Sequence, residues 1–133
     1  MNWQILNLSM TMKNNLKRIV ITGGAGFIGS NLSRKLLKEG AEKILIIDDL
    51  STGKIKNIED LMELDEIEFI ESRVEDIKNL NETLSNFDFC FHLAAGVGVQ
   101  YIMENVSKAL LTNIEATHLM IEACKVNNLP ILI

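Results

Sequence analysis

The sequence predicts an α/β fold in which helices cover both faces of a doubly wound parallel sheet. Short apolar runs that fit buried strands alternate with segments in which apolar residues recur at helical spacing. No internal repeat or low-complexity linker interrupts this alternation, and 133 residues suffice for one domain with one core. Right-handed crossovers between successive strands then make a parallel sheet the simplest arrangement.

The first strand, expected at Ile19–Ile21, leads into a glycine-rich turn. Thr22–Gly29 reads T-G-G-A-G-F-I-G and fits both G-x-G-x-x-G and G-x-x-G-x-x-G. Gly23 or Gly24 would allow the sharp turn off the strand. Gly26 would let the backbone approach a pyrophosphate, and Gly29 would let the following helix pack closely on the strand. The expected helix has apolar residues at Phe27, Ile28, Leu32, Leu36 and Leu37.

The start of that helix is a potential phosphate site, because its first N–H groups have no partner within the helix. A glycine turn that merely connects a strand to a helix is the alternative when this motif is taken alone. The second strand, expected at Lys43–Ile47, favours the phosphate site. It ends in Asp48-Asp49, and Asp48 lies about 20 residues past Gly29, where an acidic side chain can bind ribose hydroxyls.

The charge of Asp48 would repel a 2′-phosphate, which favours NAD over NADP. Lys54 and Lys56 lie nearby in the sequence and weigh against this preference. The alternative interpretation of Asp48 is a plain polar residue at a strand end.

The remaining segments continue the alternation after a polar turn at Leu50–Lys54. The expected elements are a short helix at Ile55–Leu64, a third strand at Glu66–Ile70, a helix at Ile77–Ser85 with Asp76 as its N-cap, a fourth strand at Phe87–Leu93, a helical turn at Val99–Glu104, a long helix from about Val106 to Val126, and a fifth strand at Leu129–Ile133. Small residues follow the fourth strand at Ala94-Ala95-Gly96, so a ligand could approach the backbone there. Gly96–Val99 either lines a pocket or forms a plain loop.

Composition excludes several classes of protein. The net charge of −5 and the lack of a basic block argue against nucleic acid as a partner. No apolar run approaches the roughly 20 residues that span a bilayer. Cys90 and Cys124 lie in apolar segments and are expected to be free buried thiols, and no metal site is predicted. Residues 1–15 lack a secretion signal and are expected to form a flexible extension of a cytoplasmic protein.

Five motifs occur in order at fitting intervals: Thr22–Gly29, Asp48–Gly53, Val74–Ile77, His92–Ala95 and Asn113. Together they resemble the extended short-chain dehydrogenases, and within these the NAD-dependent sugar-nucleotide epimerases and dehydratases of the UDP-glucose 4-epimerase type. The resemblance covers roughly Lys17 to Ile133. It implies that residues 16–133 form a Rossmann-type NAD-binding domain. It also implies hydride transfer between a nucleotide-sugar and the nicotinamide.

The resemblance implies roles for individual residues. The pyrophosphate would be bound by Gly23, Gly26, Phe27, Ile28 and Gly29. The adenosine ribose would be held by Asp48, with Asp49, Ser51, Thr52 and Gly53 lining the adjacent loop. The adenine would meet Asp76 and Ile77, and the middle of the cofactor would meet Leu93, Ala94 and Ala95. Asn113 would steady the neighbouring strand, and His92 is expected to be a satisfied core residue.

The sequence does not contain a match to the catalytic groups of that family. Its members use a tyrosine as general acid or base and a lysine four residues later that lowers the tyrosine pKa. The single tyrosine, Tyr101, is followed at that distance by Asn105. We therefore expect an NAD-binding portion, truncated after the fifth strand, with negligible turnover. An unpaired Ile131–Ile133 strand would favour self-association.

Two other functions stay open. One is a non-catalytic nucleotide-binding or regulatory module, which would need no tyrosine–lysine pair. The other is a short-chain reductase of small carbonyls, against which the acidic strand end and Gly96–Val99 weigh. A P-loop phosphotransferase is excluded because no G-K-[ST] follows the glycines.

Overall fold

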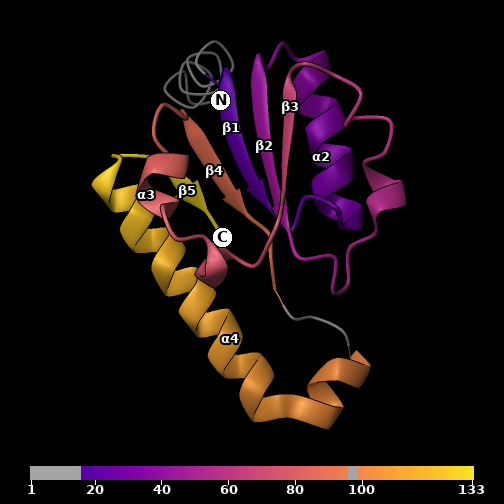
Figure 1. The fold of residues 1–133 in the computed structure, drawn as a ribbon, viewed down its shortest axis with the longest axis vertical. Helices are drawn as coiled ribbons and strands as arrows, with labels where there is room; N and C mark the ends of the chain where they lie inside the picture. The colour runs from indigo at the N-terminus through magenta and orange to yellow at the C-terminus, as the bar shows by residue number, and fades with distance from the viewer. Residues whose placement is uncertain (1–15, 96–98) are drawn as a thin grey trace, which may run out of the picture.

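The computed structural model describes residues 16–95 and 99–133, and for residues 99–110 and 112 it describes the backbone alone. Figure 1 shows a twisted sheet flanked by helices. The elements are β1 (Arg18–Thr22), α2 (Phe27–Lys38), β2 (Lys43–Asp48), η1 (Ile55–Asn57), β3 (Ile67–Glu71), η2 (Val74–Asp76), α3 (Leu80–Thr83), β4 (Phe89–His92), α4 (Val99–Val126) and β5 (Ile131–Leu132). The predicted α/β class with a parallel sheet is confirmed.

The sheet has five parallel strands in the order β3-β2-β1-β4-β5. The central strand is β1, and its last residue, Thr22, pairs with Ile47 of β2 and with His92 of β4. The chain moves outward from β1 in one direction through β2 and β3, and in the other through β4 and β5. The strand order therefore reverses between β1 and β4, and open α/β sheets bind ligands beyond the carboxyl ends of the strands at such a point.

Two apolar cores lie on the two faces of the sheet. Alternate residues of each strand point to opposite faces, so Val20 and Leu45 enter one core and Ile19 and Ile44 the other. Residues of α4 fill the first core and residues of α2 pack against the second, in agreement with the helices on opposite sides of the sheet in Figure 1. Coverage of both faces explains why the central strands are continuous apolar runs.

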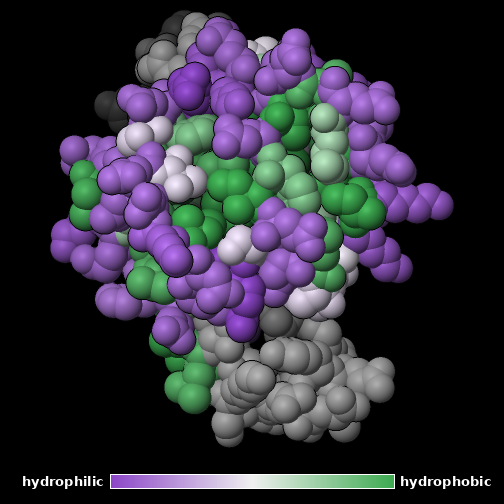
Figure 2. All heavy atoms as spheres, in the orientation of Figure 1, coloured by the Kyte–Doolittle hydropathy of each residue, from purple (hydrophilic) through white to green (hydrophobic). Residues whose placement is uncertain are grey.

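Hydrophilic residues cover much of the face seen in Figure 2. In the space-filling view, apolar residues gather across the middle of this face and hydrophilic residues surround them (Figure 2). Within the described part of the chain, no helix combines the length and the apolar character that a bilayer crossing requires.

The predicted helix at Ile55–Leu64 is wrong. Only η1 forms, and turns follow it in which the N–H groups of residues 58, 61 and 64 bond to the carbonyl groups of residues 55, 58 and 61. Ile58 and Leu61 are buried as an amphipathic helix would bury them. Their spacing of three residues also suits successive tight turns, so the periodicity could not distinguish the two structures.

Two further expectations change. The helix expected at Ile77–Ser85 is limited to α3, and its N-cap is Asn79, which makes no capping hydrogen bond. Asp76 lies in η2 and is therefore not the N-cap. The expected turn at Val99–Glu104 and the long helix after it form the single helix α4. The expectations for residues 1–15 and for Gly96–Gly98 fall outside the described residues.

Candidate functional site

The glycine turn packs directly against the end of β4. Gly23 has a positive φ of +70°, so it makes the turn that the sequence assigned to Gly23 or Gly24. A Cβ at Gly23 would lie 2.7 Å from the backbone nitrogen of Ala94 and 2.8 Å from the carbonyl carbon of Leu93. Such distances are too short for any side chain. The turn and the residues after β4 therefore lie together at the carboxyl edge of the sheet.

Helix α2 starts in close contact with the same turn. A Cβ at Gly29 would lie 2.5 Å from the carbonyl oxygen of Gly23 and 2.6 Å from the Cα of Gly24. Gly26 occupies the N-cap position, and no side chain caps the helix. The first N–H groups of α2 are thus free of a side-chain cap at the helix end where anions are favoured.

Two large apolar side chains stand exposed at this helix start. Phe27 is 82% exposed and Ile28 is 69% exposed. Both residues belong to the first turn of α2, whose N–H groups form the potential anion site. These two residues therefore border the potential anion site.

Asp48 connects the glycine turn to the loop after β2. One carboxylate oxygen accepts the Ala25 N–H at 2.9 Å, and the other accepts the Leu50 N–H at 2.9 Å. A Cβ at Gly53 would lie 2.7 Å from the carboxylate, so a side chain there would have to displace it. Asp48 is 7% exposed. Each carboxylate oxygen can accept more than one hydrogen bond, which leaves capacity for a ligand hydroxyl.

The loop after β2 and the segment after β3 lie at the same edge. Asp49 accepts hydrogen bonds from the backbone and the hydroxyl of Ser51, at 3.0 and 2.6 Å, and an Arg73 nitrogen lies 3.8 Å from it. Ser51 and Thr52 are exposed. In η2, Asp76 is exposed and the following Ile77 is half-buried. The predicted ribose and adenine residues thus follow two neighbouring strand ends.

The residues after β4 complete this edge. The Leu93 N–H donates to the Thr22 carbonyl at 3.0 Å, and the Ala94 N–H donates to the Thr22 hydroxyl at 3.2 Å. Ala94 is half-buried and Ala95 is exposed. Asn113 is half-buried on α4, one turn before Thr117 and so on the same helix face.

His92 is a satisfied core residue, as the sequence predicted. Its ring nitrogens lie 2.7 Å from the Thr22 hydroxyl and 3.3 Å from the Thr117 hydroxyl, so the ring connects β1 to α4. Burial lowers the pKa of His92 below the ordinary histidine value. Both partners are uncharged, so the neutral ring is favoured.

Acidification is expected to destabilise the chain through His92. Because the folded state lowers the His92 pKa, the unfolded chain binds more protons below the unfolded value of about 6.5. The stabilisation by neutral His92 is complete above that pH and decreases as the pH falls towards the lowered folded pKa. Urea unfolding of the chain between pH 7.5 and 5 measures this slope. His92→Gln should flatten it.

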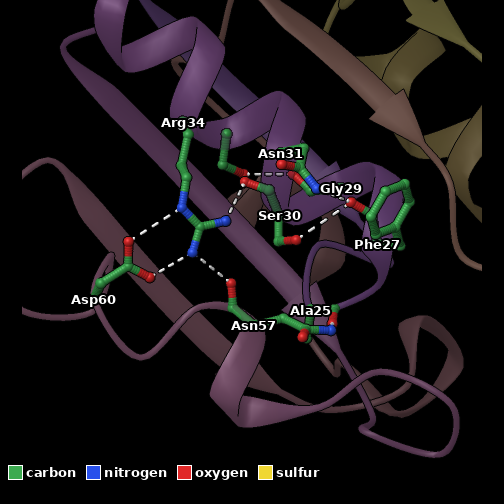
Figure 3. Close-up of polar contacts among 9 residues, drawn as sticks. Ala25, Phe27, Gly29, Ser30, Asn31, Arg34, Asn57 and Asp60 are labelled. Carbon is green, nitrogen blue, oxygen red and sulfur yellow. Dashed lines mark hydrogen bonds and ion pairs between the residues drawn. The ribbon is translucent and has the colours of Figure 1, made fainter.

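Figure 3 shows a polar network around Arg34 that could not be predicted from the sequence. Arg34 of α2 binds Asp60, 26 residues away, and the Asn57 carbonyl. Neither residue belongs to a motif, so no local signal points to the contact. No role was predicted for the Thr22 side chain, although its hydroxyl lies directly before the glycine turn and bonds to His92 and to the Ala94 N–H.

No group of residues suited to a metal ion occurs in the described part of the chain. Cys90 and Cys124 are both free and buried, which confirms the prediction for them.

Comparison with known proteins gives consistent matches. The family model described as GDP-mannose 4,6 dehydratase matches residues 20–131. UDP-N-acetyl-alpha-D-glucosaminuronate decarboxylase of Bacillus cytotoxicus is 38% identical over 107 residues, which cover 80% of this chain and 32% of that protein.

Solved structures match the fold. UDP-N-acetylglucosamine 4-epimerase from Methanobrevibacter ruminantium, in complex with UDP-N-acetylmuramic acid, gives a TM-score of 0.75 at 34% identity, with 85% of this chain and 35% of that chain covered. The dTDP-glucose 4,6-dehydratase DesIV from Streptomyces venezuelae, with NAD and TYD bound, gives 0.78 at 26% identity, with 84% and 37% covered. The chain thus spans about a third of the length of these relatives.

Proposed function

We propose that residues 16–133 bind NAD at the carboxyl edge of the sheet, because the chain belongs to the GDP-mannose 4,6 dehydratase family. This family consists of NAD-dependent sugar-nucleotide epimerases and dehydratases of the extended short-chain type. The observation that carries this proposal is the contact between Asp48 and the glycine turn, at 2.9 Å from the Ala25 N–H. The contact holds the Asp48 carboxylate close to the glycine turn that leads into α2, which supports a ribose site next to a phosphate site. The DesIV dehydratase, a structural neighbour, was solved with NAD bound.

The residues at this edge fit the cofactor. Glycine is required where the turn approaches β4 and α2, and no side chain caps α2. We assign the pyrophosphate to the turn and helix start, the adenosine ribose to Asp48 and the loop of residues 49–53, the adenine to Asp76 and Ile77, and the middle of the cofactor to Leu93–Ala95. Asn113 would support this edge from α4. Bound NAD supplies a hydride acceptor, and the chain's own residues bind and orient it.

The corresponding activity is the oxidation of a sugar within a nucleotide-sugar. The relatives named above act on UDP- and dTDP-sugars. We propose a nucleotide-sugar as the substrate of the protein that contains this chain. The sequence has no lysine four residues after Tyr101, so the 133 residues alone should bind cofactor without measurable epimerase or dehydratase turnover.

Calorimetric titration of the purified chain with NAD and NADP tests the cofactor assignment. We expect NAD to bind, and NADP to bind at least about tenfold more weakly, because a 2′-phosphate would face the Asp48 carboxylate. Equal or tighter binding of NADP would contradict the role of Asp48. No binding of either dinucleotide would contradict the proposal as a whole.

The chain as described is also expected to associate with itself. Strand β5 is an edge strand that pairs with β4 alone, and Leu132 and Ile133 are 50% and 64% exposed. Exposed apolar edge strands pair readily with another copy. Light scattering at increasing concentration should show oligomers of the 133-residue chain. Leu132→Lys should shift the distribution towards monomer, and a wild-type chain that stays monomeric throughout would exclude this association.

A further inference from the structure

Arg34 of α2 contacts Ser30 in its own helix and two residues, Asn57 and Asp60, in the segment after β2 (Figure 3). Its guanidinium binds the Asp60 carboxylate through two nitrogens, with the Nε contact at 3.1 Å. The same group donates to the Ser30 carbonyl at 3.1 Å and to the Asn57 carbonyl at 2.8 Å. Arg34 therefore ties the first turns of α2 to the segment of residues 57–60.

Asn57 carries this connection to the glycine turn. Its side-chain nitrogen donates to the Ala25 carbonyl at 2.8 Å, and the Lys54 N–H donates to the same oxygen at 3.1 Å. The Ala25 N–H donates to Asp48. Both polar backbone groups of Ala25 are thus held by the chain that leads out of β2.

We propose that Arg34, Asp60 and Asn57 form a clamp that positions the glycine turn relative to the ribose loop of residues 49–53. This inference rests on the proposed function, since one dinucleotide must reach both segments at once. Phosphate and ribose are joined covalently, so an error in the separation of the two segments weakens binding even if each segment keeps its own shape.

The geometry distinguishes this clamp from an ordinary surface ion pair. The side chains of Arg34 and Asp60 are 32% and 62% exposed, so their attraction adds little to stability. The planar guanidinium, however, satisfies a carboxylate and two carbonyl groups at fixed angles, which a lysine cannot do. The hydrogen bond from Arg34 also holds the pKa of Asp60 below its ordinary value.

The test compares Arg34→Met with Lys43→Met in the 133-residue chain. Lys43 pairs with Glu68 at 3.1 Å with similar exposure, 27% and 52%, but at the amino end of β2, the opposite end of that strand from Asp48. We expect Arg34→Met to weaken NAD binding by about tenfold, equivalent to about 1.4 kcal/mol. Lys43→Met should leave the Kd for NAD within about twofold at a similar change in melting temperature.

A second readout needs no ligand. Hydrogen exchange of the Lys54 amide reports its bond to Ala25 directly, and in Arg34→Met it should quicken by tenfold or more while amides of β1 and β2 keep their protection. Arg34→Lys should restore the Lys54 amide only in part. If the Lys54 amide stays protected, or if both methionine variants bind NAD equally, the clamp is refuted. Failure of the wild-type chain to bind NAD would refute the proposed function, while the Lys54 amide would still decide whether the clamp exists.

Discussion

Gly23→Ala is expected to destabilise the chain by about 2–5 kcal/mol and to abolish NAD binding. Two costs add at this position. The positive φ of +70° costs an alanine about 1–2 kcal/mol. The new Cβ would also lie 2.7 Å from the Ala94 backbone nitrogen, and overpacking of this kind costs a further 1–3 kcal/mol or so. Urea unfolding measures the change in the free energy of unfolding, and calorimetry measures the loss of binding.

Gly40→Ala is the matched control for this variant. Gly40 also has a positive φ, of +93°, but a Cβ there would meet nothing within 4 Å. Only the backbone cost should appear, about 1–2 kcal/mol, and NAD binding should be unchanged. Equal destabilisation by the two variants would mean that the glycine turn does not press against the end of β4.

Asp48→Ala is expected to cause the largest loss of NAD affinity that preserves the fold, about a hundredfold. The substitution would remove the carboxylate and with it the charge-assisted hydrogen bonds that it accepts from the ribose hydroxyls, each worth about 1.5–3 kcal/mol. The substitution also leaves the Ala25 N–H without its partner, in a residue that is fully buried. The free energy of unfolding should therefore fall by about 1–3 kcal/mol. Titration with NAD and urea unfolding measure the two effects.

Asp49→Ala separates the ribose role from general acidity at this loop. Asp49 is exposed, and its bonds to Ser51 lie within one turn. We expect a loss of NAD affinity below about fivefold, as for a single exposed polar contact. If Asp49→Ala weakened NAD binding more than Asp48→Ala did, the ribose would have been assigned to the wrong carboxylate.

The sheet was predictable because its strands are covered on both faces. Such strands read as continuous apolar runs, and Ile19–Ile21 and Lys43–Ile47 became β1 and β2 with changes of one residue at their ends. Short helices were less predictable. At Ile55–Leu64, hydrogen bonds from Lys54 and Asn57 to Ala25 fix the chain, and turns replace the helix. Contacts of this kind depend on residues far away in sequence.

The family could be predicted from the motifs, but the contacts that support the candidate site could not. Family membership confirms the resemblance drawn from the glycine turn, Asp48 and the later motifs. The sequence assigned Asp48 only to the ribose, whereas the structure shows that its carboxylate also joins Ala25 to Leu50. No sequence pattern indicated the contact between Arg34 and Asp60, because the two residues are 26 positions apart and come together only through the fold, in which the segment after β2 lies beside α2.

The most direct test of the account follows the backbone amides of the isotope-labelled 133-residue chain by NMR as NAD is added. The account predicts the largest shift changes at Gly23–Gly29 and at Asp48–Gly53, with smaller changes at Asp76, Ile77 and Leu93–Ala95. Amides at the amino ends of the strands, such as Lys43, should not move. Saturable binding that shifts other amides and leaves the glycine turn unaffected would contradict the assignment of this edge as the NAD site.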